Sequence, residues 1–335
     1  MIKILSPIAR GNGAYIVHKN IEDHVSGYKV LSYSPWITLF PPSVFPIGRN
    51  LKNNIIHTSP DYACFNKKKG VPLILTFHNY VLDKYMRPYS SFSQNIHYQA
   101  NLKWFTKRSV RYADEITAVS KFTALLVQQE LGIEKNIRVI YNGVDERKFR
   151  PVKGAQHRSE SIKVLFSGNL TTRKGAQWLL PILERLNPNV EIMYTSGLRG
   201  LGALSNHPRF VNVGKVPYEG MPHLYQSADL LLFPTVREGL PLAVLEAMSC
   251  GLPVVATNCS SLPELIDEGK GGFLCSLGDT DEFAEKINLL AETEDLRKEM
   301  GGYNRVKIER SFTQGQMVLK YQQLFDEVAQ RSHSL

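Results

Sequence analysis

Short apolar runs that alternate with helix-like segments are the feature that most restricts how this chain can fold. In its first half, six such runs predict strands: IKILSP, YKVLSY, NIIHTS, PLILTFH, EITAVS and RVIYNG. Helical patterns lie between some of them, from about Gln94 to Tyr112 and in KFTALLVQQELG. This alternation is typical of a parallel sheet with helices on both faces. The Pro-rich stretch between Ser34 and Asn53 predicts a long loop.

A second series of the same kind follows the polar segment FRPVKGAQHRSESIK, which predicts a linker. The next predicted strands are KVLFSG, VEIMYTSG, FVNVGKV, DLLLFPT, PVVAT and GGFLC. Helices are predicted in GAQWLLPILERLN, PHLYQSA, PLAVLEAMS and DEFAEKINLLAE. Because 335 residues exceed one ordinary core, we expect an α/β protein with two doubly wound domains. The expected domains are residues 1–150 and 151–315, and residues 316–335 form a terminal helix.

The stretch Gly239–Thr257, GLPLAVLEAMSCGLPVVAT, contains one charged residue, Glu246. A carboxylate amid so much apolar surface is costly unless a hydrogen bond or an opposite charge stabilises it. Pro241 suits a first helical position, so Glu238 should precede the helix and Glu246 should lie about two turns inside it. The alternative is a core helix whose single acid faces water. A helix N-terminus favours phosphates, and a nearby carboxylate accepts sugar hydroxyls, so the pattern predicts a sugar-nucleotide site.

Composition excludes several other classes of protein. The four cysteines have no metal-ligand spacing and indicate reduced thiols in a cytoplasmic protein. The N-terminus MIKILSPIARG lacks the long apolar region of a signal peptide. Residues 31–48 are uncharged, but their four prolines argue against a membrane-spanning helix.

Positive charge is concentrated in the first half of the chain. Residues 1–150 contain 21 Lys and Arg against 10 Asp and Glu, whereas residues 151–335 contain 19 against 21. Three interpretations are open: an anionic membrane surface or phosphate-bearing acceptor, nucleic acid, and ordinary solvated surface. Because no nucleic-acid-binding signature is present, we expect no nucleic-acid partner.

Polar or glycine-rich turns follow four predicted strands of the second half. In KVLFSGNLTTRKGAQWLL, Gly168 ends a strand, and Lys174 with Gly175 opens a helix. A lysine there can hold a diphosphate as a point charge, although a lone lysine at a helix start is usually just solvated. The other turns are YTSGLRG, NVGKVPYEGMPHLYQSADLLLFPT and the loop that carries Glu238.

In this order, these segments resemble the C-terminal domain of retaining glycosyltransferases of family 4 with the GT-B fold. EGLPLAVLEAMSCGLPVVAT followed by SSLPELI carries most of the resemblance, which is strong over residues 163–278. VSKFTALLVQQELG and VIYNGVDERKFRP extend it, while residues 14–110 match only loosely. The resemblance implies two Rossmann-like domains that face each other across a cleft, with the terminal helix crossing back to the first domain.

The resemblance also assigns roles in the second half. Glu238 would lie beside hydroxyls of the donor sugar, Glu246 would bind the ribose hydroxyls, and Lys174 would hold the diphosphate. Gly239 and Leu240 would offer backbone N–H groups to phosphate or sugar.

In the first half, the turn Gly11–Gly13 would bring Gly13 to the phosphates, and His78 in LTFHNY would lie near the reacting sugar. A lone histidine after a strand is more often structural. Together with Glu238 and Lys174, His78 completes the predicted catalytic set.

One departure concerns the turn that begins at Gly168. Relatives usually have arginine where this chain has Asn169, and asparagine cannot make the bidentate phosphate contacts of a guanidinium. Arg173 is the residue that could supply the missing charge. Gly168, Asn169 and Arg173 therefore complete the predicted donor-binding set.

The implied reaction transfers a glycosyl group from a nucleoside diphosphate sugar with retention, without metal or cofactor. The acceptor would be a glycan or a lipid-linked molecule of cell-surface polysaccharide or glycolipid synthesis, reached at the cytoplasmic face of the membrane. Two other functions stay open: a sugar-nucleotide epimerase, and a non-catalytic subunit that binds a sugar nucleotide.

Overall fold

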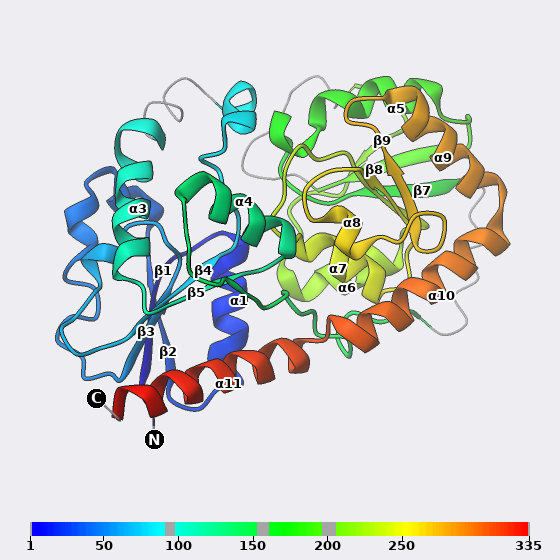
Figure 1. Cartoon of the computed structure of the whole chain (residues 1–335). Helices are drawn as coiled ribbons and strands as arrows, with labels where there is room; N and C mark the ends of the chain where they lie inside the picture. The colour runs from blue at the N-terminus through cyan, green and yellow to red at the C-terminus, as the bar shows by residue number, and fades with distance from the viewer. Residues whose placement is uncertain (1, 91–97, 153–160, 196–205, 334–335) are drawn as a thin grey trace. The chain divides into compact units, whose positions relative to one another are not determined.

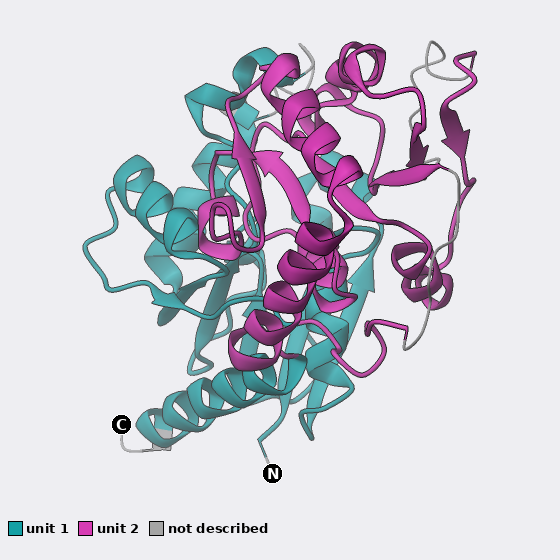
Figure 2. Cartoon of the chain, turned by 90° about the vertical axis from the view of Figure 1, so that its right-hand side faces the viewer, with its two compact units in different colours: residues 1–143, 314–335 teal, residues 144–313 magenta. Residues whose placement is uncertain are grey.

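The computed structural model describes residues 2–90, 98–152, 161–195 and 206–333, and the chain divides into two compact units (Figures 1 and 2). Unit 1 comprises residues 1–143 and 314–335, and unit 2 comprises residues 144–313. Each unit contains a six-stranded parallel sheet with helices packed against it. The predicted α/β class with two doubly wound sheets is therefore confirmed.

The sheet of unit 1 has the strand order β2-β1-β3-β4-β5-β6. Its strands are β1 (Ile4–Ala9), β2 (Tyr28–Tyr33), β3 (Ile55–Thr58), β4 (Leu73–Phe77), β5 (Glu115–Ala118) and β6 (Arg138–Val139). Its α-helices are α1 (Gly13–Glu22), α3 (Lys103–Tyr112), α4 (Lys121–Leu131) and α11 (Gln314–His333). Short helical turns are η1 (Pro35–Leu39), η2 (Pro41–Val44), η3 (Ala63–Phe65), η4 (Lys84–Tyr89) and η5 (Tyr98–Leu102). Although α11 comes last in the sequence, it packs against α1 and β3 (Figure 1).

The sheet of unit 2 has the order β12-β11-β10-β7-β8-β9. Its strands are β7 (Ile162–Phe166), β8 (Val190–Tyr194), β9 (Phe210–Asn212), β10 (Leu230–Phe233), β11 (Val254–Thr257) and β12 (Gly272–Cys275). Its α-helices are α5 (Leu179–Arg185), α6 (Met221–Gln226), α7 (Leu242–Ser249), α8 (Leu262–Leu265), α9 (Thr280–Glu292) and α10 (Glu294–Ser311). Shorter turns are η6 (Thr172–Lys174), η7 (Ala176–Trp178) and η9 (Tyr218–Gly220). The strand order starts at β7, runs outward through β8 and β9, and then resumes on the other side of β7 with β10, β11 and β12. Doubly wound folds bind ligands at this switch point, between β7 and β10.

Several helices differ from the sequence prediction. The predicted loop between Ser34 and Asn53 contains η1 and η2, because prolines fit the first turn of a helix. The predicted helix around Lys174 is only a 3₁₀ turn, and α5 begins at Leu179 because Gly175 has a positive φ of 80°. The predicted helix near residues 94–112 falls partly outside the described residues.

Helices α1, α8 and α10 were not predicted. α10 is mostly polar, so the apolar period that would reveal a helix is weak. It packs on α7 through a close backbone approach: a Cβ on Gly301 would lie 2.0 Å from the carbonyl oxygen of Gly251. Of the predicted linker, residues 153–160 lie outside the described residues, and Phe149 is fully buried in unit 2.

Candidate functional site

The loops that follow β7 and β10 are joined by backbone contacts. The N–H of Val236 donates to the carbonyl of Arg173 at 2.9 Å, and the Thr235 hydroxyl oxygen lies 3.1 Å from the same carbonyl oxygen. A Cβ on Gly175 would lie 1.9 Å from the carbonyl oxygen of Pro234, so only glycine fits there. The two loops therefore hold their side chains in a fixed relation at the switch point of the sheet.

Lys174 and Glu238 form an ion pair between these loops. Lys174 Nζ donates to Glu238 Oε1 at 2.5 Å, and Thr235 donates to the same oxygen at 2.9 Å. The side chains of Lys174 and Glu238 are 20% and 11% exposed, so both charges are largely withdrawn from water. The structure thus brings together two residues that are 64 positions apart and that sequence reasoning singled out separately.

Glu246 lies on α7, as the sequence predicts, but closer to its start. Pro241 is the N-cap, and Glu246 is the fifth helical residue, so it lies little more than one turn inside instead of two. Its side chain accepts a hydrogen bond of 2.9 Å from the Tyr225 hydroxyl. Burial raises the pKa of the Glu246 carboxyl to about 7, although Tyr225 and Lys148 act in the opposite direction. Near pH 7 this acid is therefore poised between its two protonation states.

Tyr225 is a site residue that sequence reasoning missed. Its hydroxyl lies 3.2 Å from Ser167 Oγ, and it is also the group that binds Glu246. It connects α6 to the end of β7 and to α7. The only signal in the sequence was its place in the predicted helix PHLYQSA, which says nothing about its partner.

The remaining predicted residues of unit 2 border the same loops. Gly168 follows β7, and its N–H donates to Thr195 Oγ1 at 3.2 Å. Asn169 is exposed and Arg173 is half-buried. Gly239 and Leu240 are buried just before the N-cap of α7. Most of the turn YTSGLRG lies outside the described residues.

In unit 1 the structure connects the elements that carry Gly13 and His78. Gly13 is the first residue of α1, whose N-cap Asn12 accepts a bond from the N–H of Tyr15 at 2.8 Å. His78 follows β4, and its Nε2 lies 3.0 Å from Nε2 of His18 on α1. His18 was not predicted as a site residue, because α1 itself was not recognised in the sequence.

Comparison with known families covers most of both units. The family described as Glycosyltransferase Family 4 matches residues 5–148, and the family described as Glycosyl transferases group 1 matches residues 161–293. The chain belongs to this type of glycosyltransferase. The recognition made from the sequence is thereby confirmed.

Three known proteins illustrate what this glycosyltransferase is similar to. N-acetyl-alpha-D-glucosaminyl L-malate synthase of Bacillus anthracis is 23% identical, over 93% of this chain and 85% of its own length. N,N'-diacetylbacillosaminyl-diphospho-undecaprenol alpha-1,3-N-acetylgalactosaminyltransferase of Campylobacter jejuni is 28% identical over 69% of this chain and 66% of its own length. Anabaena HepE, in complex with UDP-glucose, has a TM-score of 0.77 at 20% identity and covers 100% of both chains.

The structural similarity identifies the fold as GT-B, as the sequence predicted. In the part of the chain that the structure describes, no helix is both long and apolar enough to span a bilayer.

Proposed function

We propose that this glycosyltransferase transfers a sugar from a nucleoside diphosphate sugar, with retention and without a metal, to a glycan or lipid-linked acceptor. The observation that supports it most is the pairing of Lys174 with Glu238 at the switch point of unit 2. A cation and a carboxylate therefore lie together at the edge where doubly wound sheets bind nucleotides. The similarity to HepE, which was solved with UDP-glucose, supports this kind of donor.

Departure of the nucleoside diphosphate is the difficult step, because negative charge develops on it as the glycosidic bond breaks. Lys174, together with N–H groups of Gly239 and Leu240 ahead of α7, would stabilise that charge. Arg173 and Gly168 border the same loop, and Arg173 would supply the charge that Asn169 lacks. Glu246 would accept hydrogen bonds from the ribose.

Neither acid is assigned as a nucleophile, because each has a donor-binding role. Glu238 is already bonded to Lys174 and Thr235, and Glu246 is bonded to Tyr225. A double-displacement mechanism needs a free carboxylate about 5 Å from its partner acid. We therefore propose that the acceptor oxygen bonds to the anomeric carbon on the face of the sugar from which the nucleoside diphosphate leaves, and that a phosphate oxygen of this leaving group takes the acceptor proton.

The donor itself can be identified by nucleotide release. We expect selective release from one of a panel of UDP-, GDP- and ADP-sugars in the presence of a membrane lipid extract, unchanged by EDTA. Metal independence is contradicted if EDTA stops the release. Nucleotide binding without release on any acceptor would favour the alternative of a non-catalytic binding subunit, for which the exposed Asn169 in place of arginine is the supporting observation.

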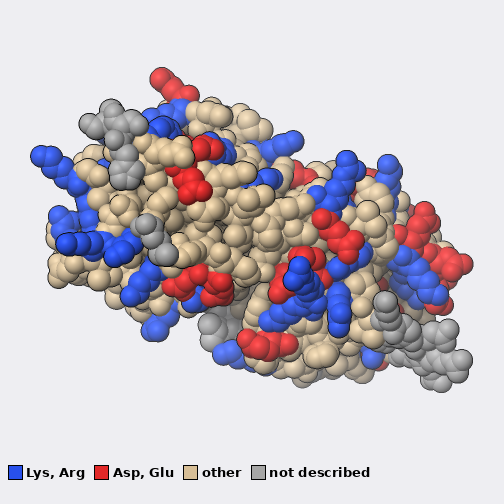
Figure 3. All heavy atoms as spheres, turned by 90° about the horizontal axis from the view of Figure 1, so that it is seen from below, with Lys and Arg blue, Asp and Glu red and all other residues tan. Residues whose placement is uncertain are grey.

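The excess of basic residues in unit 1 indicates that it binds an anionic partner. Unit 1 contains 20 Lys and Arg against 10 Asp and Glu, while unit 2 contains 20 against 21. Blue side chains dominate the left-hand edge of the view in Figure 3, where unit 1 lies. We propose that this charge brings the enzyme to the cytoplasmic face of an anionic membrane, where a lipid-linked acceptor resides. The name of the Campylobacter relative includes such a diphospho-undecaprenol acceptor.

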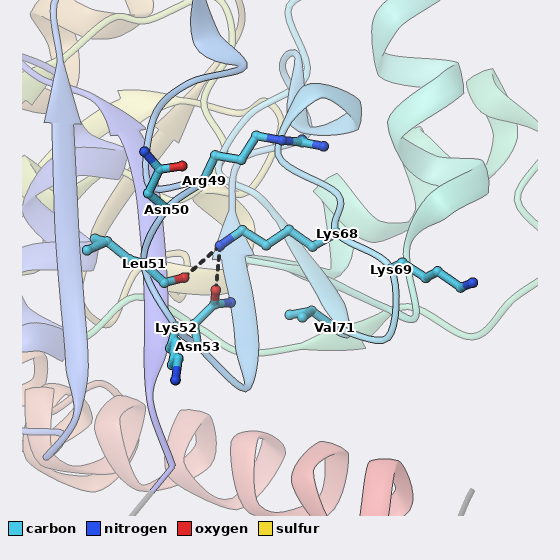
Figure 4. Close-up of a pocket in the computed structure, with 8 residues that line it drawn as sticks. All are labelled: Arg49, Asn50, Leu51, Lys52, Asn53, Lys68, Lys69 and Val71. Carbon is cyan, nitrogen blue, oxygen red and sulfur yellow. Dashed lines mark hydrogen bonds between the residues drawn. The ribbon is translucent and has the colours of Figure 1, made fainter.

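A shallow basic hollow marks the surface that would meet the lipid. It has a volume of about 470 Å³, and none of the described residues that line it is acidic. Lys68 lies in its centre and donates to the Leu51 carbonyl at 2.9 Å and to Asn53 Oδ1 at 2.7 Å (Figure 4). Arg49, Lys52 and Lys69 surround it. Burial lowers the pKa of Lys68, with Arg49 adding to the effect, as expected where cations share a site.

Exposed aromatic side chains extend this surface. A second hollow shares Arg49 with the first and is lined by Phe45, Trp104 and Arg108 among others. Phe45 carries the Arg49 guanidinium 3.8 Å above its ring. Earlier in the chain, Trp36 in η1 is 77% exposed and Phe40, between η1 and η2, is 69% exposed. Aromatic rings beside cations suit the interface between headgroups and acyl chains.

Vesicle binding tests this surface. Because each lysine near an anionic bilayer contributes about 1 kcal/mol, Lys52→Glu with Lys69→Glu should lower binding to phosphatidylglycerol vesicles at least tenfold. The matched control, Lys121→Glu with Lys320→Glu, changes the net charge equally on α4 and α11 and should bind nearly as well as wild type. Equal sedimentation with phosphatidylcholine vesicles, or an equal loss in the control, would refute the proposed surface.

A further inference from the structure

A third loop reaches the site of unit 2. Residues 258–261, the β11 loop, connect β11 to α8. Because β11 pairs in parallel with β10, this loop leaves the sheet at the same edge as the loop that carries Glu238. The N–H of Glu238 donates to Ser260 Oγ at 3.1 Å, and Cys259 Sγ lies 3.4 Å from the carbonyl oxygen of Thr235. The β11 loop therefore contacts the loop after β10 at two points.

Ser260 has a backbone conformation that serine rarely adopts. Its φ is +49°, in the left-handed region, and among the described residues Tyr62 is the only other residue besides glycines with a positive φ. A Cβ is crowded in this conformation, so glycine usually takes such positions. Strained residues of this kind persist where the surrounding structure fixes them, and they cluster at functional sites. The hydroxyl is the group that serine offers here and the less strained glycine does not.

The hydroxyls on either side of Ser260 have no such contact. Thr257 Oγ1 at the end of β11 and Ser261 Oγ before α8 are buried and have no hydrogen-bond partner among the described residues. Each lowers stability, because a buried hydroxyl without a partner loses its bonds to water. The local structure therefore places Ser260 against Glu238 while leaving the two neighbouring hydroxyls unsatisfied.

Different loops hold the two ends of Glu238. Its carboxylate accepts from Lys174 after β7 and from Thr235 on its own loop, whereas its N–H is bonded to Ser260 after β11. Lysine has a long flexible side chain, so an ion pair alone would allow both charged groups to shift together. The contact with Ser260 fixes the backbone from which the Glu238 side chain extends.

We infer that Ser260 is a positioning residue, which holds Glu238 where its carboxylate accepts hydroxyls of the donor sugar. The identity of that ligand as a sugar rests on the proposed function. Without the Ser260 hydroxyl, the backbone at Glu238 loses a fixed point and its carboxylate is displaced from the sugar for part of the time. The nucleotide is assigned to other groups, Glu246 among them, so its binding does not depend on Ser260. The β11 loop thus serves sugar recognition and not nucleotide recognition.

Amide hydrogen exchange tests the contact in the full chain without a ligand. In Ser260→Gly and Ser260→Ala, the N–H of Glu238 should exchange about tenfold faster than in the wild type, the equivalent of one hydrogen bond. Ser260→Gly should melt at a higher temperature than Ser260→Ala, because glycine adopts a positive φ without strain. The control Ser276→Ala, at an exposed position of the same unit, should leave the exchange unchanged. An unchanged exchange rate in both Ser260 variants overturns the inference.

Kinetics and binding together separate positioning from structural support. Ser260→Gly should lower kcat/KM for the donor about tenfold, while its affinity for the nucleoside diphosphate, measured by calorimetry, stays at the wild-type value. Ser260→Thr keeps the hydroxyl and should recover most of kcat/KM, even though it melts lower because a branched side chain is disfavoured at a positive φ. Equal losses of kcat/KM and nucleotide affinity in Ser260→Gly, or no loss of kcat/KM, contradict the inference.

Failure of the proposed function would be visible in the wild type. Absence of glycosyl transfer from any donor would contradict that function, and the exchange rate of the Glu238 N–H would still decide whether Ser260 holds this residue.

Discussion

Lys174→Ala is expected to lower turnover at saturating donor by a factor of about 100 to 1,000. The lysine is proposed to stabilise charge that develops on the departing diphosphate, and removing one such preorganised group from an active site typically costs that much. Because the benefit is realised in the transition state, kcat should fall more than donor affinity. The measurement is nucleotide release at several donor concentrations, with the donor found by the panel assay.

The control for this variant is another paired lysine of unit 2. Lys298 pairs with Glu294 at 2.6 Å on the exposed surface, so Lys298→Ala removes an ion pair without touching the site. In Lys174→Ala, Glu238 loses its ion pair and keeps the hydrogen bond from Thr235. Because a charge without its partner lowers stability, the melting temperature of each variant has to be recorded. Lys174→Arg keeps the charge and should recover part of the rate. An unchanged rate at saturating donor in a folded Lys174→Ala protein would contradict the leaving-group role.

Glu246→Ala is expected to remove activity at ordinary donor concentrations, chiefly by weakening donor binding about a hundredfold. Two hydrogen bonds from ribose hydroxyls to a carboxylate contribute about 3 kcal/mol together. Calorimetric titration with the nucleoside diphosphate measures this loss directly. Glu219→Ala, an exposed acid just before α6, is the matched control. Wild-type donor affinity in Glu246→Ala would refute the ribose assignment.

The pKa of Glu246 adds a second test of the same assignment. With a pKa of about 7, the carboxyl is mostly protonated at pH 6 and mostly ionised at pH 8. Because the ionised form accepts the ribose hydroxyls more strongly, donor affinity should be about tenfold weaker at pH 6 than at pH 8. Glu246→Gln should remove this dependence. A wild-type affinity that is constant over this range would count against the role.

The strands were predictable because the central ones, such as β4 and β10, are buried along their whole length. Parallel strands of this kind form continuous apolar runs, and every strand of the two sheets overlaps a run singled out in the sequence. α10 was not predictable in this way, since few of its residues are buried and Gly301 packs through its backbone. Short helical turns such as η1 and η2 begin at prolines. They have no periodic pattern of apolar residues, so the sequence pattern did not predict them.

Of the two acids and the lysine singled out in unit 2, Glu246 stands out by its surroundings, whereas Lys174 is a weak signal alone and received its role from the family resemblance. Glu246 is the one charge in a long apolar stretch, and Lys174 and Glu238 flank predicted strand ends. Tyr225 and His18 were not recognisable, since their roles depend on which helix packs beside which strand. A hydroxyl or imidazole in a helix has no role until the sheet order assigns its partner.

The close contact at Gly175 limits how this enzyme can be re-engineered. Since no side chain fits between residue 175 and the Pro234 carbonyl, the loops after β7 and β10 cannot be exchanged or lengthened one at a time. A graft of donor preference from a relative must carry both segments together, as a single cassette. Variant libraries confined to one loop would mostly disrupt the contact between Gly175 and Pro234. Libraries that vary both loops together would keep this contact and change only the residues beyond it.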